Sequence, residues 1–459
     1  MEHLMAVILA AGEGKRMKSR KSKVVHKVCG KALVEWVYKA VSRAGIEESI
    51  LVVGHRADQV RDCMGERVVY AVQEKQLGTG HAVMQAEEHL RGKDGLVIIL
   101  CGDTPLVTSE TITKTIEYHK SKNNSATVIT AEMDDPTGYG RIIRNDNGDV
   151  IKIVEHRDAT DEQRSVKEIN SGMYCFTIRE LLEALKQLNN NNSQGEYYLT
   201  DTLEILISKG LKVGAMKVED QDEILGINDR IQLAQASEIM RKRINTRFMK
   251  EGITIIDPAY TYIAEEAVIG MDTIIYPGTF IEGATTIGED CIIGPNSRII
   301  DSSIGNEVEV NNSIVIESFV DDETHIGPFA YIRPECKIGK KVKIGDFVEV
   351  KKSQIGDKTK ISHLTYVGDA EVGKNVNLGC GVVFVNYDGM KKSKTLVEDN
   401  AFIGCNSNLV SPVVVKANSY VAAGSTITDE VPENALAIAR SRQVNKEEWV
   451  TKKGIKRKE

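Results

Sequence analysis

The sequence predicts two folded parts of different class, an α/β domain with a mostly parallel sheet and a parallel β-helix of hexapeptide repeats. Three observations predict them: strand–helix alternation in the first half, one long amphipathic stretch, and an aliphatic residue at every sixth position in the second half. At 459 residues the chain is too long for a single hydrophobic core. The expected domains are 1–228 and 251–459, with a linker helix over 229–250 between them.

Short apolar runs alternate with amphipathic stretches in the first half. MAVILA, SILVVG, GLVIILCGD and ATVIT are strand-like, and residues 33–44 and 108–121 are helix-like. Such alternation predicts a sheet covered by helices on both faces. Ligands of these sheets bind beyond the carboxyl ends of the strands.

An apolar stripe marks the segment 229–250, with charged residues elsewhere. It consists of Leu233, Ala236, Met240, Ile244 and Phe248. The spacing predicts one helix of about 20 residues, roughly 30 Å long. We expect this helix to connect the two domains and to carry no chemistry.

The second half repeats with a period of six, which fits neither a helix nor a plain strand. It is typical of a parallel β-helix, whose stacked coils bury a column of aliphatic side chains. At about 18 residues and about 4.8 Å per coil, residues 263–430 predict roughly nine coils. The aliphatic series is Ile263, Ile269, Ile275, Ile281, Ile287, Ile293 and Ile299, then, after register slips, Ile326, Ile332, Ile338, Ile344 and Val350, and finally Ile403, Leu409, Val415, Val421 and Ile427.

The composition excludes several classes of protein. The 59 Lys and Arg nearly balance the 66 Asp and Glu, which argues against binding to nucleic acid or an anionic membrane. No apolar run reaches membrane-spanning length, and the eight cysteines are scattered with no C-x-x-C pair. We expect a soluble cytoplasmic protein with neither a zinc site nor a disulfide framework.

A glycine-rich turn with cations follows the first strand. Gly12 and Gly14 let the backbone approach a ligand closely, and Lys15, Arg16 and Lys23 supply positive charge. The turn matches neither a P-loop nor the full G-x-G-x-x-G pattern. Taken alone, it fits a simple connection as well as a phosphate site.

Two further features of the first half indicate a ligand. Asp103 ends a strongly apolar strand, where a carboxylate is a typical magnesium ligand beside phosphates, although a helix cap or turn is the alternative. The loop from Gln76 to His81 has two glycines and suits a flat base or a sugar.

Two cations occupy equivalent places in the hexads. Arg333 and Lys351 each follow the aliphatic residue of a hexad and are separated by three whole hexads, so they are expected to stack on successive coils. Like charges in that arrangement are destabilising, and a bound sugar phosphate would explain them. A solvated charged face is the alternative.

A histidine and two small residues share another place in the hexads. His363 is two residues after its aliphatic residue, so it should point outward, as a surface histidine or as a base for an amine that attacks a thioester. Cys405 and Ala423 hold the same place three hexads apart, and with Cys380 they could line a slot for a pantetheine arm. Small residues also occur there for tight turns. The hexads break between 384 and 402, which predicts a binding loop.

The first-half motif resembles the L-A-A-G-x-G-x-R-M…K signature of sugar-1-phosphate nucleotidyltransferases. Lys15 replaces a frequent Thr, and Ser22 precedes Lys23 where Pro is usual. Over its whole length the chain resembles the bacterial family of bifunctional N-acetylglucosamine-1-phosphate uridylyltransferases/glucosamine-1-phosphate acetyltransferases (the GlmU family), because two unrelated motif sets occur in the expected order.

This resemblance implies a Rossmann-like nucleotidyltransferase domain, a left-handed β-helix and a homotrimer with shared acetyl-transfer sites. It implies Mg²⁺ as cofactor, and acetyl-CoA and UTP as co-substrates. The C-terminal domain would acetylate glucosamine-1-phosphate, and the N-terminal domain would couple the product to UTP, releasing pyrophosphate. The product, UDP-N-acetylglucosamine, would feed peptidoglycan synthesis.

The resemblance also implies roles for individual residues. In the first half, Arg16 and Lys23 would be catalytic, Asp103 and Asn228 would hold the metal, and the nucleotide and its sugar would be bound by Leu9, Ala10, Ala11, Gly12, Lys23, Gln73, Gly78, Thr79, Gly140, Glu155, Asn170 and Asn228. In the second half, His363 would be the general base, with glucosamine-1-phosphate on Arg333, Lys351, Tyr366, Asn377 and Lys392, and acetyl-CoA on Cys380, Asn386, Tyr387, Cys405, Ala423 and Arg440.

Two other functions fit parts of the sequence. In one, the β-helix is a regulatory or oligomerising scaffold without catalysis, attached to a working nucleotidyltransferase. In the other, the whole chain is a sugar-nucleotide sensor. Departures from the family pattern at Cys380, often alanine, and Cys405, often serine, are expected to tune binding at most.

Overall fold

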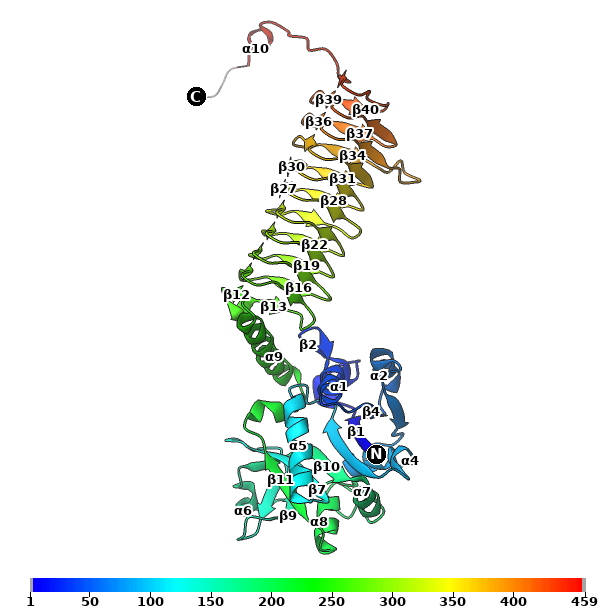
Figure 1. Cartoon of the computed structure of the whole chain (residues 1–459), viewed down its shortest axis with the longest axis vertical. Coiled ribbons are helices and arrows are strands. Elements are labelled where there is room, and N and C mark those ends of the chain that lie inside the picture. The colour runs from blue at the N-terminus through cyan, green and yellow to red at the C-terminus, as the bar shows by residue number, and fades with distance from the viewer. Residues whose placement is uncertain (1–2, 456–459) are drawn as a thin grey trace. The chain divides into compact units, whose positions relative to one another are not determined.

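The computed structural model describes residues 3–455, which fall into two compact units divided between Met240 and Arg241 (Figure 1). The division lies within helix α9 (Arg230–Lys250), so the helix expected over 229–250 is present. Of its expected apolar stripe, Ala236, Met240, Ile244 and Phe248 are buried. Within 3–455, no helix has both the length and the apolar character needed to cross a membrane.

The first unit is built on one nine-stranded sheet with the central order β11-β7-β10-β6-β1-β4-β5, to which β8 and β9 are attached. All pairings along the central order are parallel except those of β10, which is antiparallel to both neighbours. The strands are β1 (His3–Ala10), β4 (Glu48–Val53), β5 (Val69–Val72), β6 (Gly95–Cys101), β7 (Ala126–Glu132), β8 (Arg141–Arg144), β9 (Val150–Val154), β10 (Glu168–Thr177) and β11 (Val213–Lys217).

Helices cover both faces of this sheet, as expected from the alternation in the sequence. Val7 and Val97 pack in one buried cluster, whereas their neighbours Ile8 and Ile98 pack in the other. The helices are α1 (Leu33–Arg43), α2 (Ala57–Met64), α3 (Thr79–Met84), α4 (Glu87–Leu90), α5 (Ser109–Lys122), α6 (Asp161–Arg164), α7 (Ile178–Leu185) and α8 (Asp201–Ser208), with 3₁₀ turns η1 (Lys15–Met17), η2 (Lys23–Val25) and η3 (Gln221–Ile224) and a small hairpin of β2 (Lys27–Val28) and β3 (Lys31–Ala32).

The second unit is a parallel β-helix of three sheets, which we call sheets I, II and III. Sheet I contains β12 (Thr254–Ile255), β15 (Ile274–Ile275), β18 (Ile292–Ile293), β21 (Glu309–Val310), β24 (His325–Ile326), β27 (Lys343–Asp346), β30 (Lys360–His363), β33 (Asn377–Leu378), β36 (Phe402–Ile403), β39 (Tyr420–Val421) and β41 (Leu436–Ala437). Sheet II contains β13 (Tyr262–Ile263), β16 (Phe280–Glu282), β19 (Arg298–Ile300), β22 (Ile314–Ile316), β25 (Tyr331–Ile332), β28 (Glu349–Lys351), β31 (Tyr366–Gly368), β34 (Val383–Val385), β37 (Asn408–Val410) and β40 (Thr426–Ile427). Sheet III contains β14 (Val268–Ile269), β17 (Thr286–Ile287), β20 (Ser303–Ile304), β23 (Phe319–Val320), β26 (Lys337–Ile338), β29 (Gln354–Ile355), β32 (Ala370–Val372), β35 (Thr395–Val397) and β38 (Val413–Val415).

The register of the coils confirms the six-residue period and shows where it slips. The aliphatic residues pair in register and are buried, as in the column Ile332, Val350 and Val367. Ile332 pairs with Val350 after three full hexads, whereas Ile299 pairs with Val315, two positions short of that spacing. The coils therefore differ in length, in agreement with the register slips in the sequence, because corners lose one or two residues without moving the buried column.

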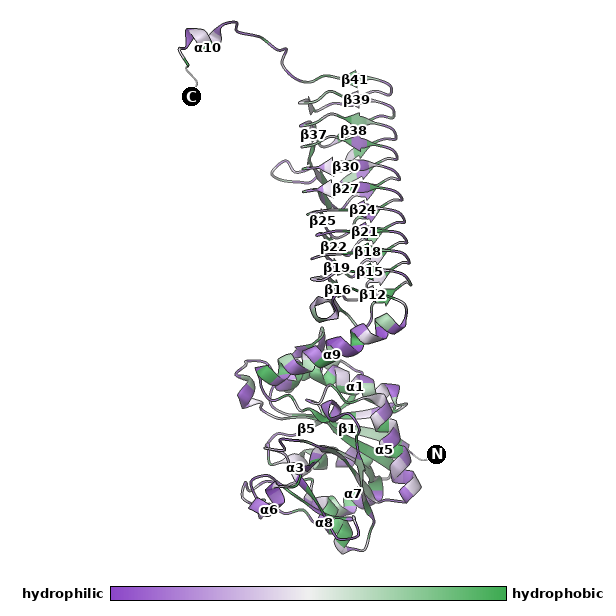
Figure 2. Cartoon of the chain, turned by 90° about the vertical axis from the view of Figure 1, so that its left-hand side faces the viewer, coloured by the Kyte–Doolittle hydropathy of each residue, from purple (hydrophilic) through white to green (hydrophobic). Residues whose placement is uncertain are grey.

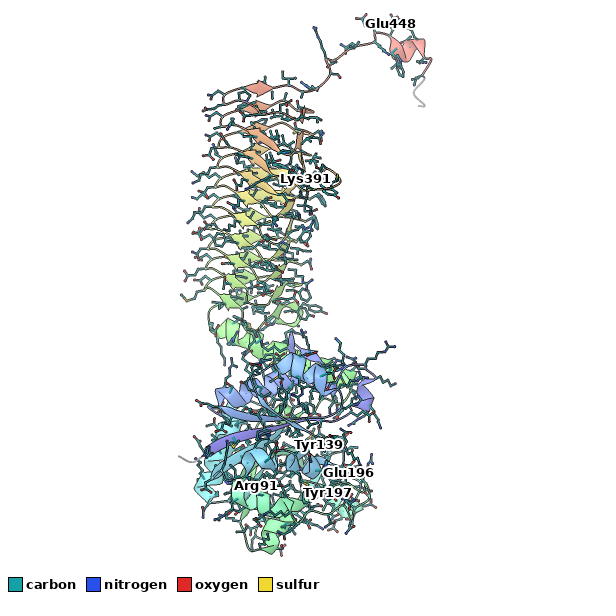
Figure 3. All side chains as sticks on the ribbon, turned by 90° about the vertical axis from the view of Figure 1, so that its right-hand side faces the viewer. Arg91, Tyr139, Glu196, Tyr197, Lys391 and Glu448 are labelled. Carbon is teal, nitrogen blue, oxygen red and sulfur yellow. The ribbon has the colours of Figure 1, made fainter. Side chains whose placement is uncertain are left out.

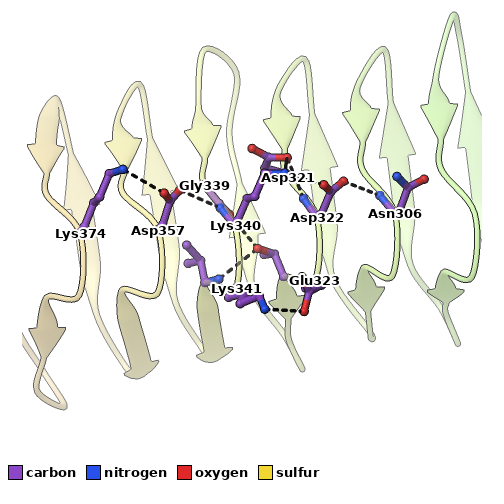
Figure 4. Close-up of polar contacts among 11 residues, drawn as sticks. Asn306, Asp321, Asp322, Glu323, Gly339, Lys340, Lys341, Asp357 and Lys374 are labelled. Carbon is purple, nitrogen blue, oxygen red and sulfur yellow. Dashed lines mark hydrogen bonds and ion pairs between the residues drawn. The ribbon is translucent and has the colours of Figure 1, made fainter.

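The corner between sheets III and I is held by hydrogen bonds from one coil to the next (Figure 4). Asp322 Oδ1 accepts from the amide of Asn306 at 2.9 Å, and Asp357 Oδ1 accepts from the amide of Lys340 at 3.1 Å. A Cβ added to Gly339 would lie 2.5 Å from that Asp357 oxygen. The glycine after an aliphatic residue in these hexads therefore makes room for a side chain of the following coil.

The corner between sheets I and II carries large apolar residues, which we call the apolar corner stripe. Phe329, Phe347 and Leu364 have φ values of 61°, 57° and 48°, a backbone region unusual for bulky residues. Each is more than half exposed, and the rings of Phe329 and Phe347 stack at 5.4 Å. The stripe is thus both strained and solvated in the single chain.

The last residues leave the stack. Residues 440–455 are exposed and include α10 (Trp449–Lys452), and Figure 2 shows this tail extending away from the coils. At the other end of the β-helix, the turn η4 (Pro258–Tyr260) precedes β13.

Candidate active sites

The glycine-rich turn of the first unit packs against Lys23. Ala10 and Ala11 are buried at the end of β1, and the exposed Gly12 has open space where a Cβ would be. Gly14 has φ 65°, and a Cβ there would lie 2.7 Å from Lys23 Cβ. Glycine is therefore needed for the turn to close over the stem of this lysine.

The ammonium of Lys23 joins the two residues expected to bind metal. It forms an ion pair with Asp103 Oδ2 and donates to Asn228 Oδ1 at 3.2 Å. The amide of Ile227 donates to the carbonyl of Asp103 at 2.9 Å, which fixes the segment that carries Asn228. Residues from three distant parts of the sequence thus meet at the carboxyl ends of β1 and β6.

The geometry around Lys23 fits a divalent cation. The two oxygens that converge on the ammonium, one carboxylate and one amide, are hard donors of the kind that Mg²⁺ prefers. Residues 3–455 contain no cluster of three or more His, Cys, Asp or Glu side chains able to hold a metal. This is compatible with Mg²⁺, which is usually held by one or two carboxylates together with water and substrate phosphates.

Two residues expected at the nucleotide, Gly78 and Thr79, meet the segment 197–199, and a third, Gln73, contacts Gly78. Gln73 is buried and donates to the carbonyl of Gly78 at 3.1 Å. Gly78 has φ 108°, and a Cβ there would lie 2.5 Å from the carbonyl oxygen of Tyr197. Thr79 Oγ1 accepts from the amide of Leu199 at 3.1 Å. The loop is therefore fixed on this segment, which we did not identify from the sequence.

A cavity of about 200 Å³ collects the residues expected around the sugar. Leu9, Thr79, Gly140, Glu155 and Asn170 line it. The remaining lining residues were not identified from the sequence: Cys101, Gly138, Tyr139, Ser171, Gly172, Tyr174, Leu199 and Thr200. Figure 3 labels Tyr139 and shows it in the first unit.

Polar groups of this cavity are arranged to bind hydroxyl or amide groups. Asn170 Oδ1 accepts from the Tyr174 hydroxyl and from the Gly172 amide, both at 3.0 Å. The pairing of β10 with β7 is irregular between Asn170 and Tyr174, which a sequence pattern does not reveal. The Thr200 hydroxyl is buried and has no hydrogen-bond partner within the described chain, so it is available to a ligand.

Carboxylates beside the cavity have perturbed ionisation. Burial raises the pKa of Glu155, and the charges of Asp158, Asp201 and Glu196 raise it further. Burial, with Glu204 and Asp158, also raises the pKa of Asp201 to about 6. Both groups favour the protonated form more than an exposed carboxylate does.

Arg333 and Lys351 do stack on successive coils of sheet II, since the amide of Arg333 donates to the carbonyl of Val350 at 2.8 Å. Each cation nevertheless has a carboxylate of its own. Arg333 pairs with Glu349 at 2.8 Å, and Lys351 pairs with Asp369 at 3.0 Å. The following coil thus supplies compensating charge for each cation, and a sugar phosphate on this pair stays a prediction.

Further expected residues gather around Lys351. Asn386 Nδ2 donates to Asp369 and lies 3.4 Å from the Tyr366 hydroxyl. Partial burial is the largest single influence and disfavours the charge on Lys351, but the hydrogen bond and charge of Asp369, with Lys392 and Tyr366, together outweigh it, so the pKa of Lys351 is raised. The neighbouring ammonium of Lys351 lowers the pKa of Lys392.

This group has more positive than negative charge. Three cations, Arg333, Lys351 and Lys392, face two carboxylates, Glu349 and Asp369. The group therefore has one cation in excess, and an anion such as a phosphate can offset that charge.

His363 lies at the end of β30 in sheet I, and its side chain is 56% exposed, as expected for an outward position. Its Nδ1 contacts Asp346 Oδ1 on the preceding coil. Tyr366 begins β31 of sheet II three residues later. His363 thus belongs to sheet I, and the cations Arg333 and Lys351 belong to coils of the adjacent sheet II, which also contains Tyr366.

Three residues expected to bind acetyl-CoA lie at the same corner as His363, on the coils that follow it. The amide of Gly381 donates to the His363 carbonyl at 3.4 Å, that of Asn406 to Cys380 at 2.8 Å, and that of Gly424 to Cys405 at 2.8 Å. His363, Cys380, Cys405 and Ala423 therefore form one column, with a single residue from each coil.

Three expected residues, Asn377, Tyr387 and Arg440, lie outside both this column and the group around Lys351. Asn377 is on β33 of sheet I, and Arg440 follows β41 in an exposed position. Tyr387 and Lys392 bridge in the loop that projects from the β-helix, in which Figure 3 labels Lys391. The loop accounts for the break in the hexads.

Comparisons with known proteins match both units. A family described as "Nucleotidyl transferase" matches residues 5–225, and one described as "Bacterial transferase hexapeptide (six repeats)" matches residues 266–301. A "Bifunctional protein GlmU" from Acetivibrio thermocellus is 69% identical over all of both chains. Another from Halalkalibacterium halodurans is 55% identical over 99% of this chain and all of the relative.

These matches extend through both units in one order, and the coil register continues the hexapeptide fold well beyond 266–301. The chain therefore belongs to the bifunctional GlmU family, and it is an enzyme that combines uridylyltransferase and acetyltransferase activities in the synthesis of UDP-N-acetylglucosamine.

Proposed function

We propose that the corner between sheets I and II is the acetyl-transfer site and that His363 is its general base. The observation that supports this proposal is that Tyr366, three residues after the exposed His363, contacts Asn386, which also donates to the partner of Lys351, Asp369. The phosphate of glucosamine-1-phosphate would bind Arg333 and Lys351. The amine of the same substrate would then face the imidazole of His363, with Tyr366 beside the sugar.

Acetyl transfer at this corner needs one proton acceptor. The amine nitrogen attacks the thioester carbonyl carbon, the C–S bond breaks, and the imidazole of His363 takes the proton that the nitrogen loses. CoA leaves as a thiolate, which is protonated. The column of Cys380, Cys405 and Ala423 would hold the pantetheine arm, with Asn386, Tyr387 and Arg440 contacting CoA and Asn377 and Lys392 contacting the sugar phosphate.

In the first unit we propose uridylyl transfer at the ends of β1 and β6. A phosphate oxygen of N-acetylglucosamine-1-phosphate attacks the α-phosphorus of UTP in line, and pyrophosphate leaves. Gly12, Gly14 and Arg16 would face the phosphates, and Lys23 would offset their charge. Mg²⁺ held by Asp103 and Asn228 would supply further charge neutralisation.

The cavity lined by Gly140, Glu155 and Asn170 would hold the amino sugar. Gly140, Glu155 and Asn170 would bind its N-acetyl and hydroxyl groups, while Gln73, Gly78 and Thr79 would hold the uridine. The volume of this cavity, about 200 Å³, suits one sugar ring and not a whole nucleotide. This supports separate binding places for the amino sugar and the uridine.

We further propose a cytoplasmic homotrimer. The apolar corner stripe supports it, because large apolar residues held exposed in an unusual backbone conformation are typical of a surface that another subunit covers. The stripe is interleaved with His363 and its contact Asp346, so a subunit seated there would complete the acetyl-transfer site. The eight free cysteines and the expected substrates, UTP and acetyl-CoA, fit the cytoplasm.

One pair of assays tests the proposed roles. CoA release from acetyl-CoA and glucosamine-1-phosphate should fall about 10²- to 10⁴-fold in His363→Ala, to a small residual rate, while pyrophosphate release from UTP and N-acetylglucosamine-1-phosphate should be retained. Lys341→Ala is the control, since Lys341 forms an exposed pair with Glu323 on another corner of the β-helix (Figure 4). If His363→Ala acetylates as well as the control, the β-helix site is elsewhere and the assignment of the base is wrong.

A further inference from the structure

We infer that Asp346 is a positioning residue for acetyl transfer, and that it holds the imidazole of His363 with Nε2 directed to the substrate amine. This inference rests on the proposed role of His363 as the base. It adds a residue that sequence patterns did not single out, because Asp346 belongs to a different coil, 17 residues earlier in the chain.

The register places the two side chains together. β27 and β30 pair in parallel with Asp346 opposite His363, at the last residue of each strand. Asp346 Oδ1 contacts His363 Nδ1. The amide of Leu364 donates to the carbonyl of Asp346 at 2.9 Å, so the two backbones are also fixed to each other at this point. The contact therefore follows from the coil register and does not depend on a flexible loop.

The chemistry of the pair assigns a role to each ring nitrogen. An ionised carboxylate is only an acceptor, so the nitrogen that it contacts must carry the proton. The hydrogen bond from His363 lowers the pKa of Asp346, which keeps this carboxylate ionised. In the neutral imidazole the proton is then on Nδ1, and the lone pair is on Nε2. A base in this tautomer can accept the proton of an attacking amine without rearrangement.

The charge of Asp346 also acts after proton transfer. When His363 takes the proton, the imidazolium donates from both nitrogens, and Asp346 stabilises the new charge through Nδ1. Both groups are partly exposed, with side-chain exposures of 36% for Asp346 and 56% for His363. Solvent screens the interaction, so its effect on rate is expected to be smaller than in a buried catalytic triad.

A second histidine–carboxylate pair in the same sheet provides a matched control. His325 Nδ1 contacts Glu309 Oε2 at 3.0 Å on neighbouring coils of sheet I. These residues precede their aliphatic residues, whereas Asp346 and His363 follow theirs at the corner. The His325 pair is therefore of the same kind, but it does not occupy the corner that leads to Tyr366.

The test measures kcat and KM for acetyl transfer in Asp346→Ala, Asp346→Asn and Glu309→Ala. Asp346→Ala is expected to lower kcat about tenfold, which is near the lower end of the effects of residues that orient a functional side chain. The KM values for acetyl-CoA and glucosamine-1-phosphate should stay within about twofold of those of the unaltered chain. Asp346→Asn can still accept from Nδ1 but lacks the charge, so its kcat should fall between those of Asp346→Ala and the unaltered chain. Glu309→Ala should leave kcat unchanged. Uridylyl transfer and the melting temperature of all three variants should match the unaltered chain.

A double-mutant cycle separates this inference from the proposed function. If Asp346 acts through His363, adding Asp346→Ala to His363→Ala should cause no further loss. An additive loss, or an unchanged kcat in Asp346→Ala while His363→Ala is inactive, would overturn the inference and leave His363 as the base. If His363→Ala keeps its acetyl transfer, the proposed function itself fails.

Discussion

Replacing Lys351 by methionine should separate the contribution of one lysine to stability from its contribution to substrate binding. The side chains of Lys351 and Asp369 are 17% and 15% exposed, so their ion pair is intermediate between a surface pair and a buried one. Exposed pairs contribute about 0–1 kcal/mol, and breaking a buried pair costs about 3–5 kcal/mol. Asp369 keeps its hydrogen bond from Asn386 in this variant. We therefore expect Lys351→Met to destabilise the β-helix by about 2 kcal/mol, between those two ranges.

The same substitution removes a cation from the proposed phosphate site. A hydrogen bond to a charged group contributes about 1.5–3 kcal/mol, so the KM for glucosamine-1-phosphate should rise about thirtyfold. The KM for acetyl-CoA should change little. Lys340→Met is the matched control, because the Lys340–Asp322 pair has side chains 52% and 28% exposed and lies on the corner between sheets III and I.

Thermal unfolding and acetyl-transfer kinetics distinguish the two effects. In the double variant Lys351→Met with Asp369→Asn, the unpaired carboxylate is gone, so stability should recover while the KM stays high. The reasoning is refuted if the double variant recovers substrate binding, or if Lys351→Met and Lys340→Met raise the KM equally.

Three further predictions concern the first unit. Asp103→Asn should reduce pyrophosphate release to background, as should a chelator of divalent cations, with acetyl transfer unchanged in both cases; retained release in Asp103→Asn would exclude this carboxylate as the metal ligand. Gly78→Ala should raise the KM for UTP and lower the melting temperature, because its Cβ would meet the Tyr197 carbonyl at 2.5 Å, and Gly12→Ala, which has open space at that position, is the control for stability. Asp201→Asn should raise the melting temperature at pH 8 but not at pH 4. Folding raises the pKa of Asp201 from 3.8 to about 6. The folded state therefore loses stability as the pH rises from about 4 to about 6, and this stability stays lost at higher pH. An equal gain at both pH values would contradict this assignment.

The sequence predicted the β-helix well because its period has a single physical cause. Every coil must present an aliphatic residue to the column of the previous coil, so Ile332, Val350 and Val367 are recognisable without a structure. The shortened coils were not predictable in the same way, because a corner can lose a residue or two without disturbing that column. The stacking of Arg333 on Lys351 was predicted where the coil keeps its three full hexads.

The missed residues are those whose roles depend on contacts between distant segments. Tyr174 lines the cavity of about 200 Å³ where the pairing of β10 with β7 is irregular, and Thr200 lines it next to the segment 197–199 that contacts Gly78. Glu349 and Asp369 neutralise the stacked cations from the coil that follows each of them. A single sequence without its register gives no signal for such partners, whereas the motif residues Lys23 and Asp103 were identified and do meet.

The position of Lys23 has a consequence for the order in which ligands enter the first unit. In the free chain one ammonium satisfies the oxygens of both Asp103 and Asn228, so the acidic side chain is never left uncompensated. A divalent ion held by Asp103 and Asn228, as proposed, would replace the ammonium of Lys23 at both oxygens and leave that ammonium to meet a phosphate. Filling the proposed site would then exchange one cation for another, and a nucleotide without its metal would meet a lysine that is already engaged.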